Sequence, residues 1–462
     1  MTTSYSDGYM LQPFTSFRYE GTGEARFEDG FSMNVRFMLQ LHKNGTISGE
    51  LEILTYDIAV WSCFKKGSEF TLRGQENRVS RSLIAKGCHL VGLNDSNKKS
   101  SFSALEVLVG YDVLKNKHKG KLHLHFRVVN VWDVFRGVSV ETSLGALKLV
   151  NYGDIKESEK LMSLYHLPLI TSGIVLVIES NGSDSIRDIV ENSTKIVWDF
   201  LKITSLAQTV WHDWALLEVS EVLDEENMGI KPIFHKLRSP KSNSSYIRMN
   251  ATAIYLQQFV CSAWRGYSSE LAEKYGFDMA LEWYIQSNSG FLLETKFLAA
   301  TTCLEMLTDK FHSQNETDKL LDDKSFNKFY KQMKRHAKEH LTQMGMDTVT
   351  QAALCNSMLG IQRRSFVDKI TMLLEFWGIS YSDTGVTLKE IKDVRNRITH
   401  QGKYVEKPSS ESVEYLWKVY NGLFNILTRI LLAMLKFDAE YFDAPNSKRI
   451  RFRDVCKAKA YK

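Results

Sequence analysis

The sequence predicts a multidomain α+β protein whose β-rich part comes first and whose helical part comes last. Up to about residue 180, short segments of alternating apolar residues are separated by turn signals, which is typical of a sandwich or barrel. From about residue 184 the apolar period becomes helical, and from about residue 275 it stays helical. We therefore expect a β-rich domain at 1–182, a mixed α/β middle region at 183–270, an all-helical bundle at 275–445 and a basic tail at 446–462.

The composition is that of a globular protein with an ample core. The 462 residues favour about three domains, and 44% of them are hydrophobic and 24% charged. The net charge of +5 is compatible with a nucleic-acid partner but does not require one. Six widely spread cysteines without a C-x-x-C pair disfavour a disulfide framework or a zinc ribbon, and favour the reducing cytoplasm. We expect no membrane partner, because the most apolar stretch, Leu423–Phe437, is short and contains Arg429.

The β-rich part contains a strong hairpin signal and a clearly alternating strand. Segments Phe31–Leu41 and Thr46–Tyr56 flank Asn44-Gly45, a dipeptide that tight turns between antiparallel strands prefer. Within Lys121–Val128, apolar residues share one face and basic residues share the other, namely Lys121, His123, His125 and Arg127. A short apolar strand at Ile174–Glu179 leads into a turn signal at Asn181-Gly182.

Helices dominate the rest of the chain. In the middle region, Asp184–Gln208 and Ile247–Trp264 have helical stripes, and Trp214–Val222 between them has a strand pattern. The bundle begins with an apolar stripe from Leu293 to Phe311 at alternating steps of four and three. The later predicted helices are a basic amphipathic one at Ser325–Met344, one that Ser365 caps and Gly378 ends, and a long one with a stripe from Val413 to Leu431. The last is apolar on two sides, which indicates burial in a bundle or at a dimer seam.

The run Thr387–Tyr404 predicts a short helix with a cationic end. Thr387 and Glu390 fit a capping box, and Gly402 has the position of a C-terminal stop. The apolar stripe between them consists of Leu388, Ile391, Val394 and Ile398. His400 then lies in the last turn, where the helix dipole favours an imidazolium.

Three side chains of this helix can act on a phosphodiester. Asn396 and His400 are four residues apart and share a face. Arg395 and His400 are five apart, so about 140° of rotation separates them on an ideal helix. One copy of the motif does not easily aim both groups at one atom, whereas two copies that face each other across a dimer can.

The segment Arg395-Asn396-x-x-x-His400 resembles the R-x4–6-H motif of HEPN-domain ribonucleases. The run RNRITHQG resembles most closely the ApeA-like HEPN proteins of bacterial antiphage defence. The N-terminal half, with GYMLQPF and GTISGELEI, is similar to the ApeA N-terminal domain. The predicted helical bundle around the motif has the architecture that this resemblance implies.

The resemblance implies a cytoplasmic, metal-independent endoribonuclease without a cofactor. It would cleave RNA, tRNA among the candidates, by attack of the 2′-hydroxyl, leave 2′,3′-cyclic phosphate ends, and act in abortive infection. A homodimer or higher oligomer would share the active site, and the β-rich domain would respond to a phage-derived trigger. His400 would transfer protons, Arg395 would hold the phosphate and Asn396 would orient either. Arg397 would add a phosphate contact, and Glu305 would be the buried partner of a motif cation.

Each of these assignments has a plainer alternative. A histidine at a helix C-terminus stabilises the helix without any catalytic role, and Arg397 and Glu305 fit ordinary surface positions. The alternative function is a non-catalytic dimeric HEPN scaffold that binds nucleic acid or a phage protein. Two basic clusters are candidate nucleic-acid contacts, or else solvated faces: Lys331, Lys334 and Arg335 on a helix, and Lys121 and Arg127 on a strand. His336 and His340 have a zinc-compatible spacing, but their cationic surroundings disfavour a metal.

Overall fold

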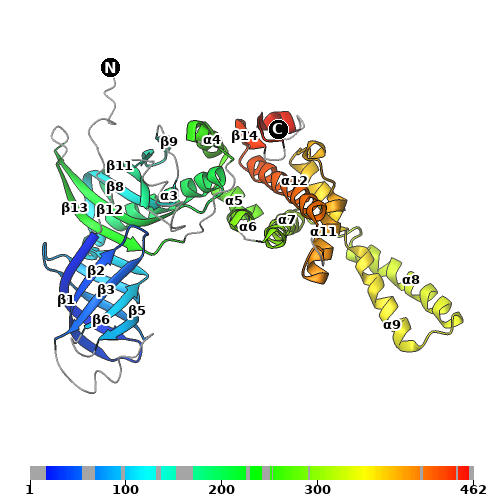
Figure 1. The fold of residues 1–462 in the computed structure, drawn as a ribbon, viewed down its shortest axis with the longest axis horizontal. Helices are drawn as coiled ribbons and strands as arrows, with labels where there is room; N and C mark the ends of the chain where they lie inside the picture. The colour runs from blue at the N-terminus through cyan, green and yellow to red at the C-terminus, as the bar shows by residue number, and fades with distance from the viewer. Residues whose placement is uncertain are drawn as a thin grey trace. The chain divides into compact units, whose positions relative to one another are not determined.

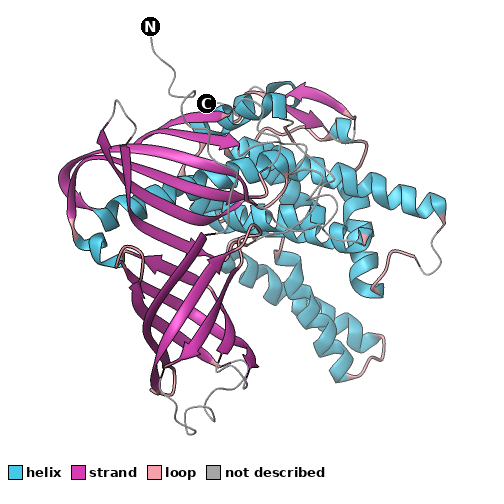
Figure 2. Cartoon of the chain, turned by 60° about the vertical axis from the view of Figure 1, so that its left-hand side comes forward, coloured by secondary structure: helices cyan, strands magenta, loops and turns pink. Residues whose placement is uncertain are grey.

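The chain folds into a strand-rich unit followed by a helical unit. The structure is a computed structural model that describes residues 17–54, 68–94, 99–131, 137–151, 170–224, 229–241, 250–251, 253–289, 292–405, 409–443 and 446–456. Two compact units comprise Met1–Trp264 and Arg265–Lys462. Strands fill most of the first and helices most of the second (Figure 1, Figure 2), which confirms the predicted β-rich N-terminal region and helical C-terminal region.

Six antiparallel strands of the first unit close into a barrel. In ring order they are β1 (Phe17–Phe27), β2 (Ser32–Leu41), β3 (Ile47–Ile53), β6 (Lys99–Ala104), β5 (Ser82–Asn94) and β4 (Glu69–Glu76). The ring closes because β4 pairs with both β1 and β5. Alternate residues fill the interior, as Val35, Phe37 and Leu39 do along β2. Local alternation left the choice between sandwich and barrel open, because only the partners of β4 decide it.

The predicted hairpin around Asn44-Gly45 is confirmed. The Gly45 N–H donates to the carbonyl of His42 at 2.9 Å, and the Thr46 N–H donates to the Asn44 side chain at 3.1 Å. Gly45 has φ 81°, a left-handed conformation that glycine adopts without strain. The turn therefore sets the register of β2 against β3.

A curved sheet continues from the barrel through β7 (Glu106–Val109), which pairs with both β5 and β13. Its further order is β13 (Gly229–Arg238), β12 (Asp213–Asp224), β8 (Lys117–Val129), β11 (Ile170–Ser185), β10 (Gly145–Asn151) and β9 (Val138–Thr142), with η1 (Tyr111–Lys115) before β8. β12 and β13 thus belong to the same sheet as β8, so the predicted middle region is no separate domain. Its predicted start at 183 lies inside β11, whose Asn181-Gly182 forms part of a register shift rather than a chain reversal.

Helix α3 (Ile186–Gln208) packs on β11 and is followed, after β13, by α4 (Ala253–Gly266). The Ser185 side chain caps α3 in a capping box with Asp188. Arg238 of β13 lies over the rings of both Trp198 and Trp214, at 4.8 and 5.0 Å, and pairs with the buried Asp213 at 3.0 Å. This stack joins α3 to the sheet face on which the apolar residues of β8 lie.

The basic face of β8 is largely buried, which corrects the prediction that it is either an open nucleic-acid contact or a solvated strand face. His123 and His125 are only 6% and 5% exposed. Glu218 of β12 stands between His125 and His235 in the strand registers, and it accepts a hydrogen bond from Arg127 Nε at 3.0 Å. Barrel strand β1 packs on part of this face, since the Tyr19 hydroxyl and His235 Nδ1 lie 2.6 Å apart and Arg127 lies 6.0 Å from the centre of the Phe17 ring. Alternation along one strand could not reveal the element that covers it.

The second unit is a helical bundle with a short hairpin at its end. Its helices are α5 (Ser269–Tyr275), α6 (Phe277–Ser289), α7 (Leu293–Asn315), α8 (Asp323–Gln343), α9 (Thr348–Ser357), α10 (Phe366–Phe376), α11 (Leu388–Gln401) and α12 (Ser410–Met434), with η2 (Met358–Gln362) and η3 (Ser382–Thr384) between them. Helices α6, α7 and α12 pack together, and α10 and α11 pack on α7. None of the described helices is long and apolar enough to cross a bilayer.

Part of the predicted basic tail is folded. β14 (Glu440–Asp443) pairs with β15 (Lys448–Arg451), and η4 (Phe452–Val455) follows. Phe452 is 1% exposed and packs against Phe437 and Tyr441. The alternation of basic residues with Ile450 and Phe452 hides an apolar face, so a count of charges alone misses this hairpin. Residues 457–462 of the predicted tail lie outside the described residues.

The strand-rich unit should lose stability in mild acid. Burial lowers the pKa of His212 and His235 to about 3 from 6.5 and also lowers the pKa of His123 and His125. Below pH 6.5 the folded state therefore binds fewer protons at these histidines than the unfolded state does. Their neutral burial contributes fully to the free energy of unfolding above pH 6.5, and this contribution decreases as the pH falls toward 3. At pH 5 the free energy of unfolding is lower by about 2 kcal/mol for each of His212 and His235. Asp213, whose pKa burial raises to about 6, offsets about 1 kcal/mol of it.

Thermal unfolding of the full chain at pH 7 and pH 5, followed by tryptophan fluorescence, measures this effect. His235→Gln should show a smaller drop in Tm than the wild type, and His336→Gln, which changes an exposed residue of α8, should show the wild-type drop. Equal Tm values for the wild type at pH 7 and pH 5 would contradict the inference that these histidines are buried in the neutral form.

Candidate functional site

Helix α11 forms as the sequence predicts. The hydroxyl of Thr387 accepts a hydrogen bond from the Glu390 N–H at 3.1 Å, and the Glu390 carboxylate accepts one from the Thr387 N–H at 2.7 Å. Gly402, with φ 73°, donates its N–H to the Ile398 carbonyl at 2.8 Å and ends the helix. The four residues of the apolar stripe are buried, so the polar residues at the C-terminal end stay toward solvent.

A buried arginine holds the segment that leads into α11. The Arg429 side chain of α12 has no exposed surface, and its Nη atoms donate to both carboxylate oxygens of Asp383, at 2.7 and 2.6 Å. Arg429 also donates to the Ser380 carbonyl at 2.6 Å and to the Tyr441 hydroxyl at 2.9 Å. One planar guanidinium thereby ties the approach to α11, the long helix α12 and strand β14 to one another.

Close backbone packing adds to this anchor. Val386, just before the cap residue, lies so near Gly422 of α12 that a Cβ there would meet Val386 Cγ2 at 2.2 Å. Only glycine fits at this crossing without a shift of α12 or of the segment before α11. The position of the motif helix therefore depends on α12 through both a charge pair and a close contact.

Arg395 is held in a fixed orientation. Its Nη2 lies 2.8 Å from Glu305 Oε1 of α7, and its Nη1 donates to Asn396 Oδ1 at 3.0 Å. The Glu305 contact is an ion pair without hydrogen-bond geometry, so Arg395 keeps N–H groups for a further acceptor. Both side chains are about one third exposed. The structure thus brings together the two residues that the sequence suggested as partners.

His400 is exposed on the last turn, away from Arg395. Helix α11 is continuous through Gln401, so the offset of about 140° between the two residues persists. Within the described residues no contact joins Arg395 to His400, and one copy of the chain does not assemble them at one point. Asn396, which accepts a hydrogen bond from Arg395, lies on the same helix face as His400.

An aromatic pair beside the motif was missed from the sequence. Arg397 lies over the ring of Tyr404 at 5.2 Å, and the rings of Tyr404 and Tyr415 are stacked 6.2 Å apart at 20°. The Tyr415 hydroxyl donates to Glu390 at 3.3 Å, and hydrogen bonds from the Thr387 backbone, the Thr387 hydroxyl and Tyr415 lower the pKa of Glu390. The glycine at 402 could have predicted this pair. A left-handed turn there reverses the chain after α11 and brings Tyr404 back beside that helix.

The other predicted contact residues differ in how accessible they are. Lys331 and Arg335 are exposed on α8, whereas Lys334 is half-buried, with its Nζ 5.5 Å from the centre of the Tyr330 ring. Arg127 is 13% exposed and paired with Glu218, and Lys121 is half-buried on the same face. The predicted basic strand surface is therefore not open, because its two histidines are buried and Arg127 is enclosed by Glu218 and Phe17.

The histidine pair of α8 gathers no further ligands. His336 Nδ1 lies 3.6 Å from Glu339, and both side chains are well exposed. Across the described ranges, no three histidine, cysteine or acidic side chains are placed to hold a metal ion.

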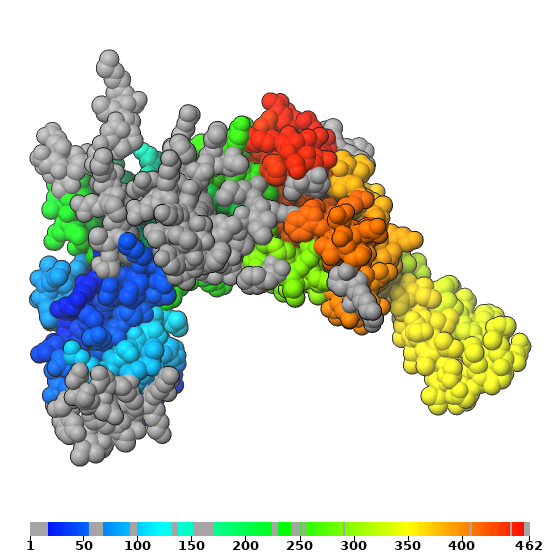
Figure 3. Space-filling model, viewed as in Figure 1, coloured from blue at the N-terminus to red at the C-terminus, as the bar shows by residue number. Residues whose placement is uncertain are grey.

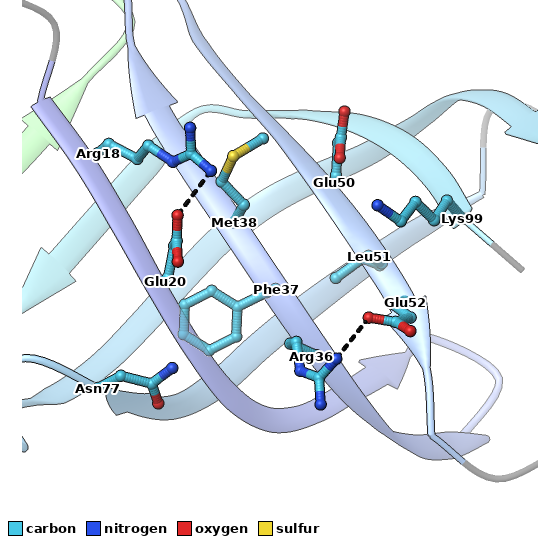
Figure 4. A pocket seen from close by; sticks show the side chains of 10 residues that line it. All are labelled: Arg18, Glu20, Arg36, Phe37, Met38, Glu50, Leu51, Glu52, Asn77 and Lys99. Atoms are coloured by element: carbon cyan, nitrogen blue, oxygen red, sulfur yellow. Dashed lines mark hydrogen bonds and ion pairs between the residues drawn. The ribbon is translucent and has the colours of Figure 1, made fainter. Parts of the chain in front are cut away.

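A hollow of about 170 Å³ lies on the outer surface of the barrel (Figure 4). Two ion pairs line it, Arg18–Glu20 at 2.6 Å and Arg36–Glu52 at 2.9 Å. Its lining carries as many basic as acidic side chains, namely Arg18, Arg36 and Lys99 against Glu20, Glu50 and Glu52.

No protein-family model, no curated protein and no solved structure matches the chain. The likeness to HEPN ribonucleases therefore rests on the motif residues and on the helical setting in which they lie.

Replacing Arg429 should destabilise the helical unit. Arg429→Met leaves the fully buried Asp443, 3.8 Å away, without its cation, and leaves the Ser380 carbonyl and the Tyr441 hydroxyl without their donor. Loss of one partner from such a buried network costs about 3–5 kcal/mol. Urea unfolding of the full chain, followed by helical circular dichroism, measures it. Asp383→Asn should cost less, because the amide oxygen can still accept from Arg429 and the Asp443 carboxylate stays 3.8 Å from the guanidinium; an equal cost for both variants would contradict this ranking.

Proposed function

We propose that this protein is a metal-independent endoribonuclease of the HEPN type that acts in antiphage defence. The observation that carries the proposal is the C-terminal end of α11, where Glu305 and Asn396 hold Arg395 and His400 is exposed one turn further on. RNA cleavage without a metal needs proton transfer and positive charge at the phosphate, which an imidazole and an oriented guanidinium can supply, and an amide can hold the guanidinium in place.

The reaction needs no external nucleophile. The RNA 2′-oxygen forms a bond to the adjacent phosphorus while the bond from phosphorus to the 5′-oxygen breaks. His400 accepts the 2′ proton, and the imidazolium so formed returns it to the departing 5′-oxygen. Arg395 donates to the phosphate oxygens as negative charge grows on them. The products are a 2′,3′-cyclic phosphate and a 5′-hydroxyl, and DNA is not cleaved because it lacks the 2′-hydroxyl.

Two copies of the chain share the site in this proposal. Because α11 keeps Arg395 and His400 on different sides of one helix, Arg395 of one chain would act with His400 of the other across a twofold axis. The strand-rich unit would respond to a phage-derived trigger and release cleavage by the helical unit, which would end in abortive infection.

Removing either motif residue should abolish most cleavage. Arg395→Ala and His400→Ala should each lower the rate of RNA cleavage by about 10²–10³, because each removes a group that acts in the transition state. The assay uses purified full-length chain, tRNA and mixed RNA in the presence of a chelator, with analysis of the product ends. Lys389→Ala, an exposed charge change at the other end of α11, is the matched control and should cleave as the wild type does.

Cleavage that persists in both variants, or that requires added metal, would contradict the proposal. RNA binding that survives His400→Ala without any product from the wild type would favour the scaffold alternative instead.

Mixing two inactive variants tests the shared site. After unfolding and refolding together, Arg395→Ala and His400→Ala chains should recover about one quarter of the wild-type rate, because half of the dimers are mixed and each mixed dimer has one intact site. Either variant refolded alone is the control and should stay inactive. If the mixture stays inactive while sedimentation shows dimers, Arg395 and His400 act within one chain and the shared site is wrong.

A further inference from the structure

Five cations form one continuous stripe along α8. Lys324, Lys328, Lys331, Arg335 and Lys338 succeed one another at steps of four, three, four and three. On an ideal helix these steps place all five within about 80° of one another over a length of about 21 Å. All five side chains are exposed. We call this set the α8 stripe.

The other face of α8 is occupied, so the stripe has to face solvent. Phe326 is 4% exposed, its ring is stacked with Tyr330 at 5.9 Å, and the Tyr330 hydroxyl donates to the Cys355 carbonyl of α9 at 3.0 Å. Cys355 is fully buried against this face. The packing of α8 on α9 thus turns the stripe outward.

The stripe is not neutralised from within the described residues. No ion pair joins any of its five members to an acidic side chain there. The two acids on α8 have other partners, since Asp323 binds Lys319 at 2.6 Å and Glu339 faces His336 at 3.6 Å. Nearby positive charges without counter-charges repel each other, and an anionic ligand removes this repulsion.

Helices α8 and α9 form an arm on the helical unit. A short antiparallel pairing closes its base. The backbone N–H of Leu320 donates to the Gln362 carbonyl at 2.8 Å, and the backbone N–H of Arg364 donates to the Asp318 carbonyl at 3.3 Å. Figure 3 shows this arm, in yellow, standing out from the rest of the helical unit. Such an arm can contact a long ligand at some distance from α11.

We propose that the α8 stripe binds the sugar–phosphate backbone of the RNA substrate, so that the arm selects long RNA. This inference rests on the proposed function and extends it to how the substrate is recognised. A regular row of cations over about 21 Å suits a row of phosphates. The sector of the stripe carries no large apolar side chain, and the exposed Phe329 lies on another side of α8, which disfavours a bilayer surface as the partner.

Binding of RNA by the double variant Lys331→Gln/Arg335→Gln tests the stripe. In a His400→Ala background, which prevents cleavage, affinity for a 40-nucleotide RNA should fall roughly tenfold at 0.1 M salt. The slope of log K against log salt should become shallower by about 1.4–1.8, because two phosphate contacts are lost. Lys148→Gln/Lys231→Gln, with the same change in net charge at exposed sites of the first unit, should bind as the parent does. Unchanged affinity and slope in the stripe variant would overturn the proposal.

The cleavage assay separates this inference from the proposed function. With His400 present, the Lys331→Gln/Arg335→Gln variant should have a higher KM for long RNA and an unchanged kcat. It should cleave a dinucleotide, which is too short to reach the stripe, at the wild-type rate. If the wild type binds RNA through the α8 stripe but cleaves none, the binding surface is supported and the proposed ribonuclease activity is refuted. Stripe-dependent binding to vesicles with 30% anionic phospholipid, without binding to RNA, would assign the stripe to a membrane and overturn the RNA proposal.

Discussion

The arrangement of the candidate site depends on one buried charge, Arg429. A guanidinium without solvent is tolerated only when its donors are satisfied, and here Asp383, the Ser380 carbonyl and Tyr441 accept from it. Its partners come from the segment before α11 and from β14 after α12, so the pair joins parts of the chain that are distant in sequence. Because the capping box begins α11 only three residues after η3, the direction of the motif helix depends on where Asp383 is held.

The continuity of α11 has a consequence for the candidate site. A continuous helix keeps Arg395 on the side of α7, where Glu305 lies, and leaves His400 on the outside. In the proposed ribonuclease, a single chain would present half of the site, and a twofold axis between two chains would complete it. The same unit carries a row of exposed cations on α8 that no acid of the described residues neutralises. Recognition of a long polyanion and chemistry on one phosphodiester would then reside in separate helices of one unit.

Much of the helical unit could be predicted because its signals are local. The capping residues Thr387 and Ser365, the glycine stop at 402 and the stripe of α7 each depend on neighbours within one or two turns. The topology of the strand-rich unit was harder to predict, because the strands that pair are distant in sequence. The pairing of β4 with β1 joins residues 43 to 55 positions apart, and the pairing of β12 with β8 joins residues 84 to 99 positions apart. The basic face of β8 was misjudged for the same reason, since Arg127 there packs on Phe17 of β1, 110 residues away in sequence.

The sequence by itself determined the order of the two units, the limits of α11 and the identity of the three polar residues at its end. These features result from helix periodicity and capping, which act over a few residues. Only the tertiary structure decided that Glu305 meets Arg395, that Tyr404 and Tyr415 stack beside Arg397, and that Arg429 anchors the approach to the motif. These contacts join side chains that are 7 to 90 residues apart, and their geometry depends on how helices and turns pack rather than on helix periodicity.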